Sequence, residues 1–324
     1  MSITAVILTY NEALHLERAI RSIQASTDQI VVVDSGSSDG TAEIAQRLGA
    51  EVHTHAFVNQ ARQFQWALDT LDIRGEWVLR LDADEIIEPD LAREIGEKLP
   101  RLPAEVVGVN LKRKHIFMDR WVRHGGRYPL VMLRLWRHGK GRVEDRWMDE
   151  HVVVWGGRTV TFDGGFADHN LHDLSYFTDK HNKYATREAI EVLNQRLGLF
   201  ARDEALSARS ASFQASFKRW VKERVYNRIP FTVSATLYFL YRYIVQLGFL
   251  DGRSGLVYHF LQGCWYRFLV GAKVMELERA VAHLHDDKAA ICAELSRLTG
   301  HKLVARSDTV APTDVRDPQL APRL

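Results

Sequence analysis

The chain has 324 residues, 43 Lys and Arg against 41 Asp and Glu, and 46% hydrophobic residues, and this length predicts one large domain with an appendage, or two units. Charged residues make up 26% and aromatic residues 10%, which excludes a wholly disordered or fibrous chain. The two cysteines, Cys264 and Cys292, are too few for a disulfide framework or a four-thiolate zinc site. A reducing compartment is expected, and no basic leader typical of a signal peptide precedes the first strand-like segment.

Acidic and basic side chains are unevenly distributed. Residues 1–100 carry 8 basic and 17 acidic side chains, residues 101–146 carry 12 and 4, and residues 201–280 carry 12 and 6. The acidic stretch suits a divalent cation, and the basic stretches suit phosphates or an anionic membrane. Nucleic acid is not expected as a partner, because no helix-turn-helix, zinc-finger or aromatic RNA-binding motif accompanies the basic stretches.

The first hundred residues alternate between two patterns. Short apolar runs predict buried strands at 3–9, 30–34, 51–53 and 77–81, and apolar residues at helical spacing predict helices at 12–23, after 37–39, and at 60–71. Strands that alternate with helices form a mostly parallel sheet with right-handed crossovers and helices on its faces. The predicted fold class is therefore α/β.

The pattern changes after residue 100. Strand-like segments at 106–111, 131–136 and 151–154 are separated by loops rich in Arg, His and Gly. They are predicted to extend the sheet in mixed orientation and to carry the acceptor side of a site. Residues 175–225 are polar and helical, and the proline-containing tail, residues 301–324, is expected to be disordered.

Two apolar segments, 229–250 and 256–272, lie between these regions. The first is long enough to cross a bilayer, but it contains Arg242, and a central Arg costs at least ~2.5 kcal/mol on insertion. Tyr and Trp are frequent there, and basic residues precede it: Lys218, Arg219, Lys222, Arg224 and Arg228. This pattern favours helices lying in the membrane interface over buried or spanning helices, so residues 201–300 are predicted to be helical and membrane-associating.

Three polar clusters follow predicted strands. They are residues 9–12 (Thr-Tyr-Asn-Glu), 34–40 (Asp-Ser-Gly-Ser-Ser-Asp-Gly) and 82–85 (Asp-Ala-Asp-Glu). Ligands of open α/β sheets bind beyond the carboxyl ends of the strands, so the three clusters are expected on one rim. No G-x-G-x-x-G follows the first strand and no G-x-x-x-x-G-K-[ST] occurs, which argues against a dinucleotide site or a P-loop ATPase.

Asp82 and Asp84 are candidates for metal binding. Two carboxylates one residue apart, directly after an apolar strand, can bind a hard cation through oxygen ligands. Such a cation could bridge the two phosphates of a nucleotide diphosphate and neutralise charge as that group leaves. The alternative is a solvated acidic turn before a helix that starts near Pro89.

Three segments together resemble family 2 glycosyltransferases with the GT-A fold, particularly those of bacterial lipopolysaccharide core and surface polysaccharides. The segments are 6–12 (VILTYNE), 33–41 (VDSGSSDGT) and 81–85 (LDADE). Their order and spacing match the family, and the likeness covers about residues 1–200. It implies a GT-A domain over 1–200, with a nucleotide-sugar half at 1–100 and an acceptor half at 101–200.

The resemblance also implies roles for individual residues. The residues implied for the nucleotide sugar are Thr9, Asn11, Glu12, Asp34, Gln60, Arg62 and Asp82. Among these, Asp34 would hydrogen-bond the base and Asp82 would lie near the ribose and the metal, while Asp84 would ligate Mg²⁺ or Mn²⁺ between the phosphates. Gln63 belongs to the same donor-side loop as Gln60 and Arg62, and the alternative for Arg62 is a surface salt bridge.

Inversion at an anomeric carbon needs one carboxylate on the acceptor side, which takes the proton of the acceptor hydroxyl. The candidates are Asp149 and Glu150. Residues 150–153 (Glu-His-Val-Val) resemble a Glu followed by valines in lipopolysaccharide-core relatives, so Glu150 is preferred and Asp149 is held in reserve. His151 departs from the basic residue expected there. The alternative is that both carboxylates are exposed at the start of a strand.

Further candidates lie in the acceptor half. His169, after strand-like 160–162 and the Gly164-Gly165 break, would be a third ligand of Mn²⁺ or a donor to phosphate, with an ordinary surface His as the alternative. Seven basic residues could bind an anionic acceptor or form a solvated face: Arg113, Lys114, Arg120, Arg123, Arg127, Arg134 and Arg137. Residues 248–256 resemble a stretch of surface-polysaccharide relatives that accompanies helices near the inner membrane.

The sequence thus predicts an inverting, metal-dependent transferase that moves a hexose from a nucleotide diphosphate sugar to a lipid-linked or lipopolysaccharide-core acceptor. UDP-glucose is the first donor to consider and GDP-mannose the second. The expected location is the cytoplasmic face of the inner membrane, with peripheral attachment. The rival hypotheses are a sugar nucleotidylyltransferase and a non-catalytic glycan- or nucleotide-binding scaffold with the same fold.

Overall fold

The computed structural model describes residues 1–144, 151–200 and 230–305. Its first hundred residues form β1 (Ile3–Thr9), α1 (Leu16–Ile23), β2 (Gln29–Asp34), α2 (Thr41–Arg47), β3 (Glu51–Thr54), α3 (Gln60–Thr70), β4 (Trp77–Asp82), β5 (Glu85–Ile87), α4 (Pro89–Lys98) and the short turn η1 (Leu99–Arg101). The strands and helices predicted for this part are confirmed, although α1 begins at Leu16 rather than at residue 12. The sequence did not indicate β5.

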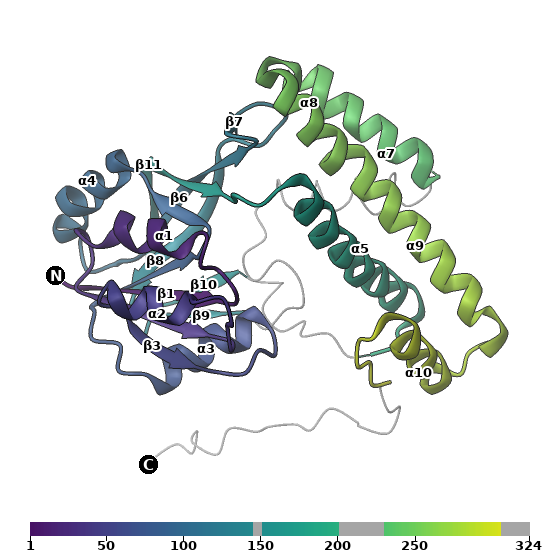
Figure 1. Ribbon diagram of the computed structural model, residues 1–324, viewed down its shortest axis with the longest axis horizontal. Helices are drawn as coiled ribbons and strands as arrows, with labels where there is room; N and C mark the ends of the chain where they lie inside the picture. Colours follow the sequence, from purple (N-terminus) through teal and green to yellow (C-terminus); the bar gives the residue numbers. More distant parts are fainter. Residues whose placement is uncertain (145–150, 201–229, 306–324) are drawn as a thin grey trace, which may run out of the picture. The chain divides into compact units, whose positions relative to one another are not determined.

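The next strands are β6 (Val106–Phe117), β7 (Arg120–Val122), β8 (Leu130–Arg137), β9 (Gly141–Val143), β10 (Val152–Val154) and β11 (Arg158–His169). The helices that follow are α5 (Leu174–Leu197), α7 (Phe231–Leu240), α8 (Gly252–Phe260), α9 (Tyr266–Val281) and α10 (Lys288–Thr299), with short turns η3 (Tyr241–Val245), η4 (Gly248–Asp251), η5 (Leu261–Trp265) and η6 (Ala282–Leu284). Figure 1 shows their order along the chain.

One sheet organises the first part of the chain. Its strand order is β3-β2-β1-β4-β8-β6-β11-β5, and β7 pairs with β6 beside this path. Strands β3, β2, β1 and β4 are parallel, β8 is antiparallel to both β4 and β6, and β11 runs parallel to β6. The α/β fold class is confirmed, and the predicted strands at 106–111 and 131–136 extend the parallel half in mixed orientation. The prediction for 151–154 is wrong in part: a strand forms there, but β10 pairs antiparallel with β9 in a separate two-stranded sheet.

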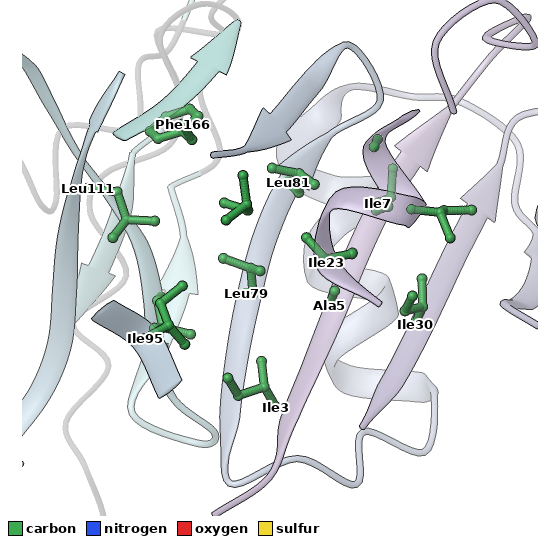
Figure 2. Packing of buried hydrophobic residues seen from close by; sticks show 14 of the residues in the cluster. Ile3, Ala5, Ile7, Ile23, Ile30, Leu79, Leu81, Ile95, Leu111 and Phe166 are labelled. Atoms are coloured by element: carbon green, nitrogen blue, oxygen red, sulfur yellow. The ribbon is translucent and has the colours of Figure 1, made fainter. Parts of the chain in front are cut away.

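Hydrophobic side chains cover both faces of this sheet. Alternate residues of β1 point to opposite faces, so Ala5 and Ile7 join one core and Val6 joins the other. Figure 2 shows the first core, where Ile23 of α1 and Ile95 of α4 pack over the strands. Helix α3 covers the second face. Burial on both faces explains why these strands read as continuous apolar runs.

Strand β11 continues through the glycines that were predicted to end it. Its pairing with β6 shifts between Thr161 and Gly165, which is a bulge rather than a break. The backbone N–H of Gly164 donates to Oε2 of Glu94 at 2.7 Å. A side chain at Gly164 would meet the Leu91 backbone at 2.5 Å. The glycines therefore let α4 approach the strand, and His169 is the last residue of β11 rather than part of a loop.

The chain divides into two compact units. The first comprises residues 1–182 and 203–269, and the second comprises residues 183–202 and 270–324. The second unit has its own core, in which Ile190 and Leu193 of α5 contact α9 and α10 through Leu277 and Leu295. The predicted domain boundaries at residues 200 and 300 stay a prediction.

Residues 230–268 of the first unit expose many large apolar side chains. The exposed fractions reach 52% at Leu237, 55% at Ile244 and 66% at Val245. Within the described residues, no single helix is long and apolar enough to cross a membrane, although 231–245 and 248–284 pass that test together as a pair bent by 74°.

This apolar segment is attached to the loop after β7. Nε of Arg242 donates to the carbonyl of Gly125 at 2.9 Å. The carboxylate of Asp251 accepts from the backbone N–H of His124 at 2.9 Å and lies 2.7 Å from its Nδ1. The stretch 248–256 therefore has a structural role, because Asp251 lies within it, is almost fully buried and makes part of this attachment.

Candidate functional site

Asp34 organises the loop that follows β2. Its Oδ1 accepts from Oγ1 of Thr9 at 2.9 Å, and its Oδ2 accepts from the backbone N–H groups of Gly36 and Ser37 at 2.9 and 2.7 Å. Burial alone would raise the pKa of Asp34, but the hydrogen bonds from Ser37, Thr9 and Gly36 outweigh it and lower that pKa. The structure thus places Thr9 and Asp34 together, with Asp34 ionised and already hydrogen-bonded by its own loop.

Asn11 and Glu12 join the same edge. Asn11 has a left-handed backbone with φ 53°, and its Oδ1 accepts from the backbone N–H of Ser38 at 2.9 Å. The Glu12 carboxylate lies 2.6 Å from Nδ1 of His15. Nε2 of His15 accepts from the backbone N–H of Leu171 at 2.9 Å, so Nδ1 carries the proton toward Glu12. The first polar cluster is therefore connected to the end of the sheet's last long strand.

In the predicted donor-side loop, the side chain that contacts the polar edge is not one of the two predicted to bind the nucleotide sugar. Gln60 and Arg62, in the first turn of α3, are exposed. Gln63 is buried, and its Nε2 donates to Oγ of Ser35 at 2.7 Å. Gln63 therefore links α3 to the loop after β2, whereas the roles of Gln60 and Arg62 stay predictions.

Asp82 and Glu85 share the guanidinium of Arg134. Nη2 of Arg134 donates to Oδ2 of Asp82 at 2.9 Å and to Oε1 of Glu85 at 2.6 Å. Burial alone would raise the pKa of Asp82, but Arg134 and Arg80 hold it well below its usual range. Burial and the charge of Asp82 raise the pKa of Glu85 in spite of Arg134.

A bulge in β8 aims Arg134 at these carboxylates. Pairing of β8 with β6 passes from Leu135 directly to Leu133, and pairing with β4 ends at Leu135. Arg134 thus has no paired residue on either β4 or β6. A bulge of this kind changes the direction of the side chain, which here points to the two acidic groups. Arg134 was predicted as a possible contact of an anionic acceptor. The structure instead places it in a buried ion pair.

Asp84 lies between the end of β4 and the end of β11. Its Oδ2 accepts from Nδ2 of Asn170 at 3.0 Å, and its carbonyl accepts from the backbone N–H of His169 at 3.0 Å. Burial and the neighbouring Asp168 carboxylate raise the pKa of Asp84. Asp168 itself is ionised, because His115 and Arg113 outweigh its burial and lower its pKa.

The described residues fit a divalent cation whose remaining ligands come from the substrate. Mg²⁺ is usually held by one or two carboxylates together with substrate phosphates and water. Asp84 offers hard oxygens, and a cation would favour its ionised form, which burial and the neighbouring Asp168 carboxylate disfavour by raising its pKa. In residues 1–144, 151–200 and 230–305, no group of three or more His, Cys, Asp or Glu is arranged to hold a metal without such a substrate.

His169 fits this role less well than Asp84. Its Nδ1 lies 3.3 Å from Nη1 of Arg18, and its Nε2 lies 3.3 Å from Oδ1 of Asp119. Arg18 also donates to the His169 carbonyl at 2.7 Å. To ligate a metal, the ring would have to leave one of these partners.

Several residues of this edge were not predicted as site residues. Asp168 had a weak signal, since it directly precedes His169. Arg18 and Asn170 had none, because they come from a helix and from the residues after β11 and meet Asp84 only in the fold. The predicted base Glu150 and its alternative Asp149 lie outside the described residues, as do the basic residues between 218 and 228.

An α/β sheet with three polar clusters at the carboxyl ends of β1, β2 and β4 is an arrangement suited to a nucleotide-linked substrate. Residues 4–153 match the family described as Glycosyl transferase family 2. The chain therefore contains a glycosyltransferase family 2 domain.

Two curated relatives illustrate the likeness. An uncharacterized glycosyltransferase of Rickettsia bellii (strain RML369-C) is 41% identical over 93 residues, which cover 29% of this chain and 31% of that protein. The chain thus spans about a third of the length of such relatives. The lipopolysaccharide core biosynthesis glycosyltransferase LpsC of Rhizobium meliloti (strain 1021) is 27% identical over 89% of this chain and 97% of that protein.

Among solved structures, the chain is similar to glucosyl-3-phosphoglycerate synthase from Mycobacterium tuberculosis, which was solved with Mn²⁺, UDP and glucosyl-3-phosphoglycerate. The sequences are 24% identical, the match covers 35% of this chain and 44% of that one, and the TM-score is 0.29. A TM-score this low assigns nothing to the present chain.

Replacing Arg134 with Gln is expected to destabilise the protein by about 3 kcal/mol, because the buried guanidinium is removed from the buried Glu85 and the partly exposed Asp82. Arg158→Gln is the matched control, since Arg158 forms an exposed pair with Glu105 at 3.7 Å and its loss should cost less than about 1 kcal/mol. Urea unfolding of both variants measures the difference. Equal losses would show that the ion pair of Arg134 does not stabilise this edge.

Proposed function

We propose that this protein is an inverting glycosyltransferase that moves a hexose from a nucleotide diphosphate sugar to a lipid-linked or lipopolysaccharide-core acceptor of a bacterial surface glycan. The observation that carries the proposal is the edge where Asp34, Asp82 and Asp84 gather at the ends of parallel strands. It lies within the family 2 domain. The nearly full-length likeness to LpsC supports the class of acceptor. A UDP-hexose such as UDP-glucose is the first donor to test, and GDP-mannose the second.

On the donor side, Thr9, Asn11, Glu12 and Asp34 form the part of the edge nearest the base and ribose in this proposal. Asp84 is the ligand for Mg²⁺ or Mn²⁺, and His169 the second candidate. Such a cation supplies charge neutralisation for a leaving diphosphate. Asp82 is held in place by Arg134, so it acts as an oriented, ionised acceptor for the ribose.

On the acceptor side, Glu150 takes the proton of the acceptor hydroxyl while the sugar–phosphate bond breaks on the opposite face of the sugar. One bond forms and one breaks in a single displacement, which inverts the anomeric centre. Asp149 is the alternative base.

The apolar surface of residues 231–250 is proposed to rest on the cytoplasmic face of the inner membrane. Arg242 is the charged residue of that segment, and its side chain is buried, so the exposed side chains there are uncharged. An exposed apolar surface of this kind with aromatic residues suits the membrane interface. Peripheral attachment would bring the site close to a lipid-linked acceptor.

The two rival hypotheses make different predictions. A sugar nucleotidylyltransferase would need a Gly-rich, Arg-containing loop after the first strand, and residues 9–12 read Thr-Tyr-Asn-Glu. A scaffold would bind the nucleotide sugar without turnover. Donor hydrolysis in the absence of acceptor separates an enzyme from a scaffold.

Asp84→Ala is expected to weaken binding of the donor sugar nucleotide more than about tenfold, because the cation that neutralises the diphosphate loses its carboxylate. Calorimetry with UDP- and GDP-sugars in Mn²⁺ and in EDTA measures this. Asp163→Ala is the control, since Asp163 is an exposed carboxylate paired with Lys112. Binding that is unaffected by EDTA and by Asp84→Ala would contradict the metal assignment.

Glu150→Gln is expected to lower kcat about a hundredfold or more with little change in donor affinity, because a general base contributes 10² to 10⁴ in rate. Asp149→Asn is the matched comparison and should retain most of the activity. Steady-state donor turnover, with hydrolysis as a readout if no acceptor is at hand, measures both variants. The reverse order of effects would make Asp149 the base.

Val245→Glu is expected to release the protein from vesicles of phosphatidylethanolamine and phosphatidylglycerol, because it puts a charge in the middle of the apolar surface. Val58→Glu is the control, since Val58 is 60% exposed in the loop before α3. Flotation on a density gradient measures binding. Equal flotation of both variants, or none of the wild type, would exclude this surface as the membrane contact.

A further inference from the structure

Tyr258 of α8 is the centre of a cationic cluster. Its ring is 1% exposed. The guanidinium groups of Arg127 and Arg242 lie 5.3 and 5.8 Å from the ring centroid. The ring of His115, near the end of β6, lies 4.7 Å away. Two stretches that are far apart in the sequence, 115–127 and 242–258, therefore meet around one buried phenol.

Several nitrogen atoms of this cluster lack a hydrogen-bond partner. Nε of Arg113, Nε2 of His115, Nε of Arg127 and Nη2 of Arg242 are buried and have no hydrogen-bond partner within the described residues. Arg242 is 4% exposed; its Nε donates to the carbonyl of Gly125 and its side chain also hydrogen-bonds Tyr258, but its Nη2 has no partner in the described part of the chain. Buried donors without partners are unfavourable and rare in folded proteins. Three such donors, on Arg113, Arg127 and Arg242, lie around Tyr258 and point to a ligand with several acceptor oxygens.

The charges of the cluster do not balance. Asp168 faces it, with its Oδ2 3.5 Å from Nη1 of Arg113 and 3.1 Å from Nδ1 of His115. Asp251 borders it through the ring of His259, which interacts with Arg242 and Arg127. Among the described residues, two carboxylates therefore stand against three guanidinium groups. Burial lowers the pKa of Arg242, and the charge of Arg127 adds to that effect. An anion would offset the excess positive charge.

The position and chemistry of the cluster define the anion. The guanidinium groups approach from three different elements, which suits a phosphoryl group with oxygens in several directions better than a planar carboxylate. Arg113, Arg127 and His115 lie on β6 and the β7–β8 loop, on the acceptor half of the sheet. Arg113 is 21% exposed, so solvent reaches the cluster. Asp168 also interacts with Asp84, which places the cluster next to the proposed donor edge.

We propose that Arg113, Arg127 and Arg242 bind a phosphoryl group carried by the acceptor. The inference rests on the proposed transferase function and names its acceptor class: a phosphorylated glycan or a lipid-linked pyrophosphate. Arg242 and Tyr258 contribute from the apolar C-terminal segment, so the surface proposed to meet the membrane also completes the acceptor site.

The test uses the full-length protein and inorganic pyrophosphate in EDTA, so that a cation on Asp84 plays no part. Calorimetry measures the affinity, and the rise of Tm with pyrophosphate provides a second readout. The variants are Arg127→Gln and Arg242→Gln. The matched control is Lys112→Gln, because Lys112 lies on β6 beside Arg113 but pairs with Asp163 at 2.8 Å. If Arg242→Gln lacks a cooperative thermal transition, the half-buried Arg127 decides the test.

Wild type and Lys112→Gln are expected to bind pyrophosphate equally, and the two arginine variants at least about tenfold more weakly, in keeping with the loss of a charge-assisted contact. UDP with Mn²⁺ should bind normally to both arginine variants and should not displace pyrophosphate. No binding by the wild type, or equal binding by Arg127→Gln and Lys112→Gln, would overturn the site. Displacement by UDP would assign the anion to the donor instead. Loss of UDP-sugar binding in every protein, with pyrophosphate binding intact, would reject the transferase function separately.

Discussion

The ion pair between Arg134 and the carboxylates of Asp82 and Glu85 holds the site together. It joins β8, which is antiparallel to its neighbours, to the turn between β4 and β5 at the point where the backbone ladder of β4 and β8 has ended. The side chain thus replaces backbone hydrogen bonds just where the proposed donor edge begins. Breaking such a buried pair from one side leaves charge without a partner, so the position of Asp82, and with it Asp84, depends on Arg134.

Much of the parallel half could be predicted from the sequence, because strands buried on both faces are continuous apolar runs and their polar ends mark the edge. The mixed half was harder, since two bulges set its geometry. The run at 131–136 predicts an ordinary strand and contains no sign that Arg134 is skipped. Gly164 and Gly165 suit a strand end as well as a bulge. The choice between them depends on Glu94 of α4, whose carboxylate binds the bulged backbone.

The basic residues show the same limit. Seven were grouped from the sequence because they are close along the chain, yet they have different roles. Arg134 serves the acidic turn, and Arg137 packs over Trp77, whereas Arg113 and Arg127 approach Tyr258. Arg242, the third arginine near Tyr258, was not among the seven, because in the sequence it appears only as a charged residue within an apolar segment. Proximity in sequence identified the charge of this region, and only the fold could identify which guanidinium groups face one another.

The ring of His259 is enclosed by two glycines. A side chain at Gly125 would approach Cε1 of the ring to 2.1 Å, and one at Gly248 would approach Cδ2 to 2.7 Å. The loop after β7 and the segment 242–259 therefore pack so closely that neither glycine can carry a side chain without a shift of the His259 ring. In a chimera between relatives, these two stretches would have to be exchanged as a pair, however far apart they lie in the sequence. The proposed acceptor site would then be exchanged together with the C-terminal apolar segment, while the first hundred residues could be replaced separately.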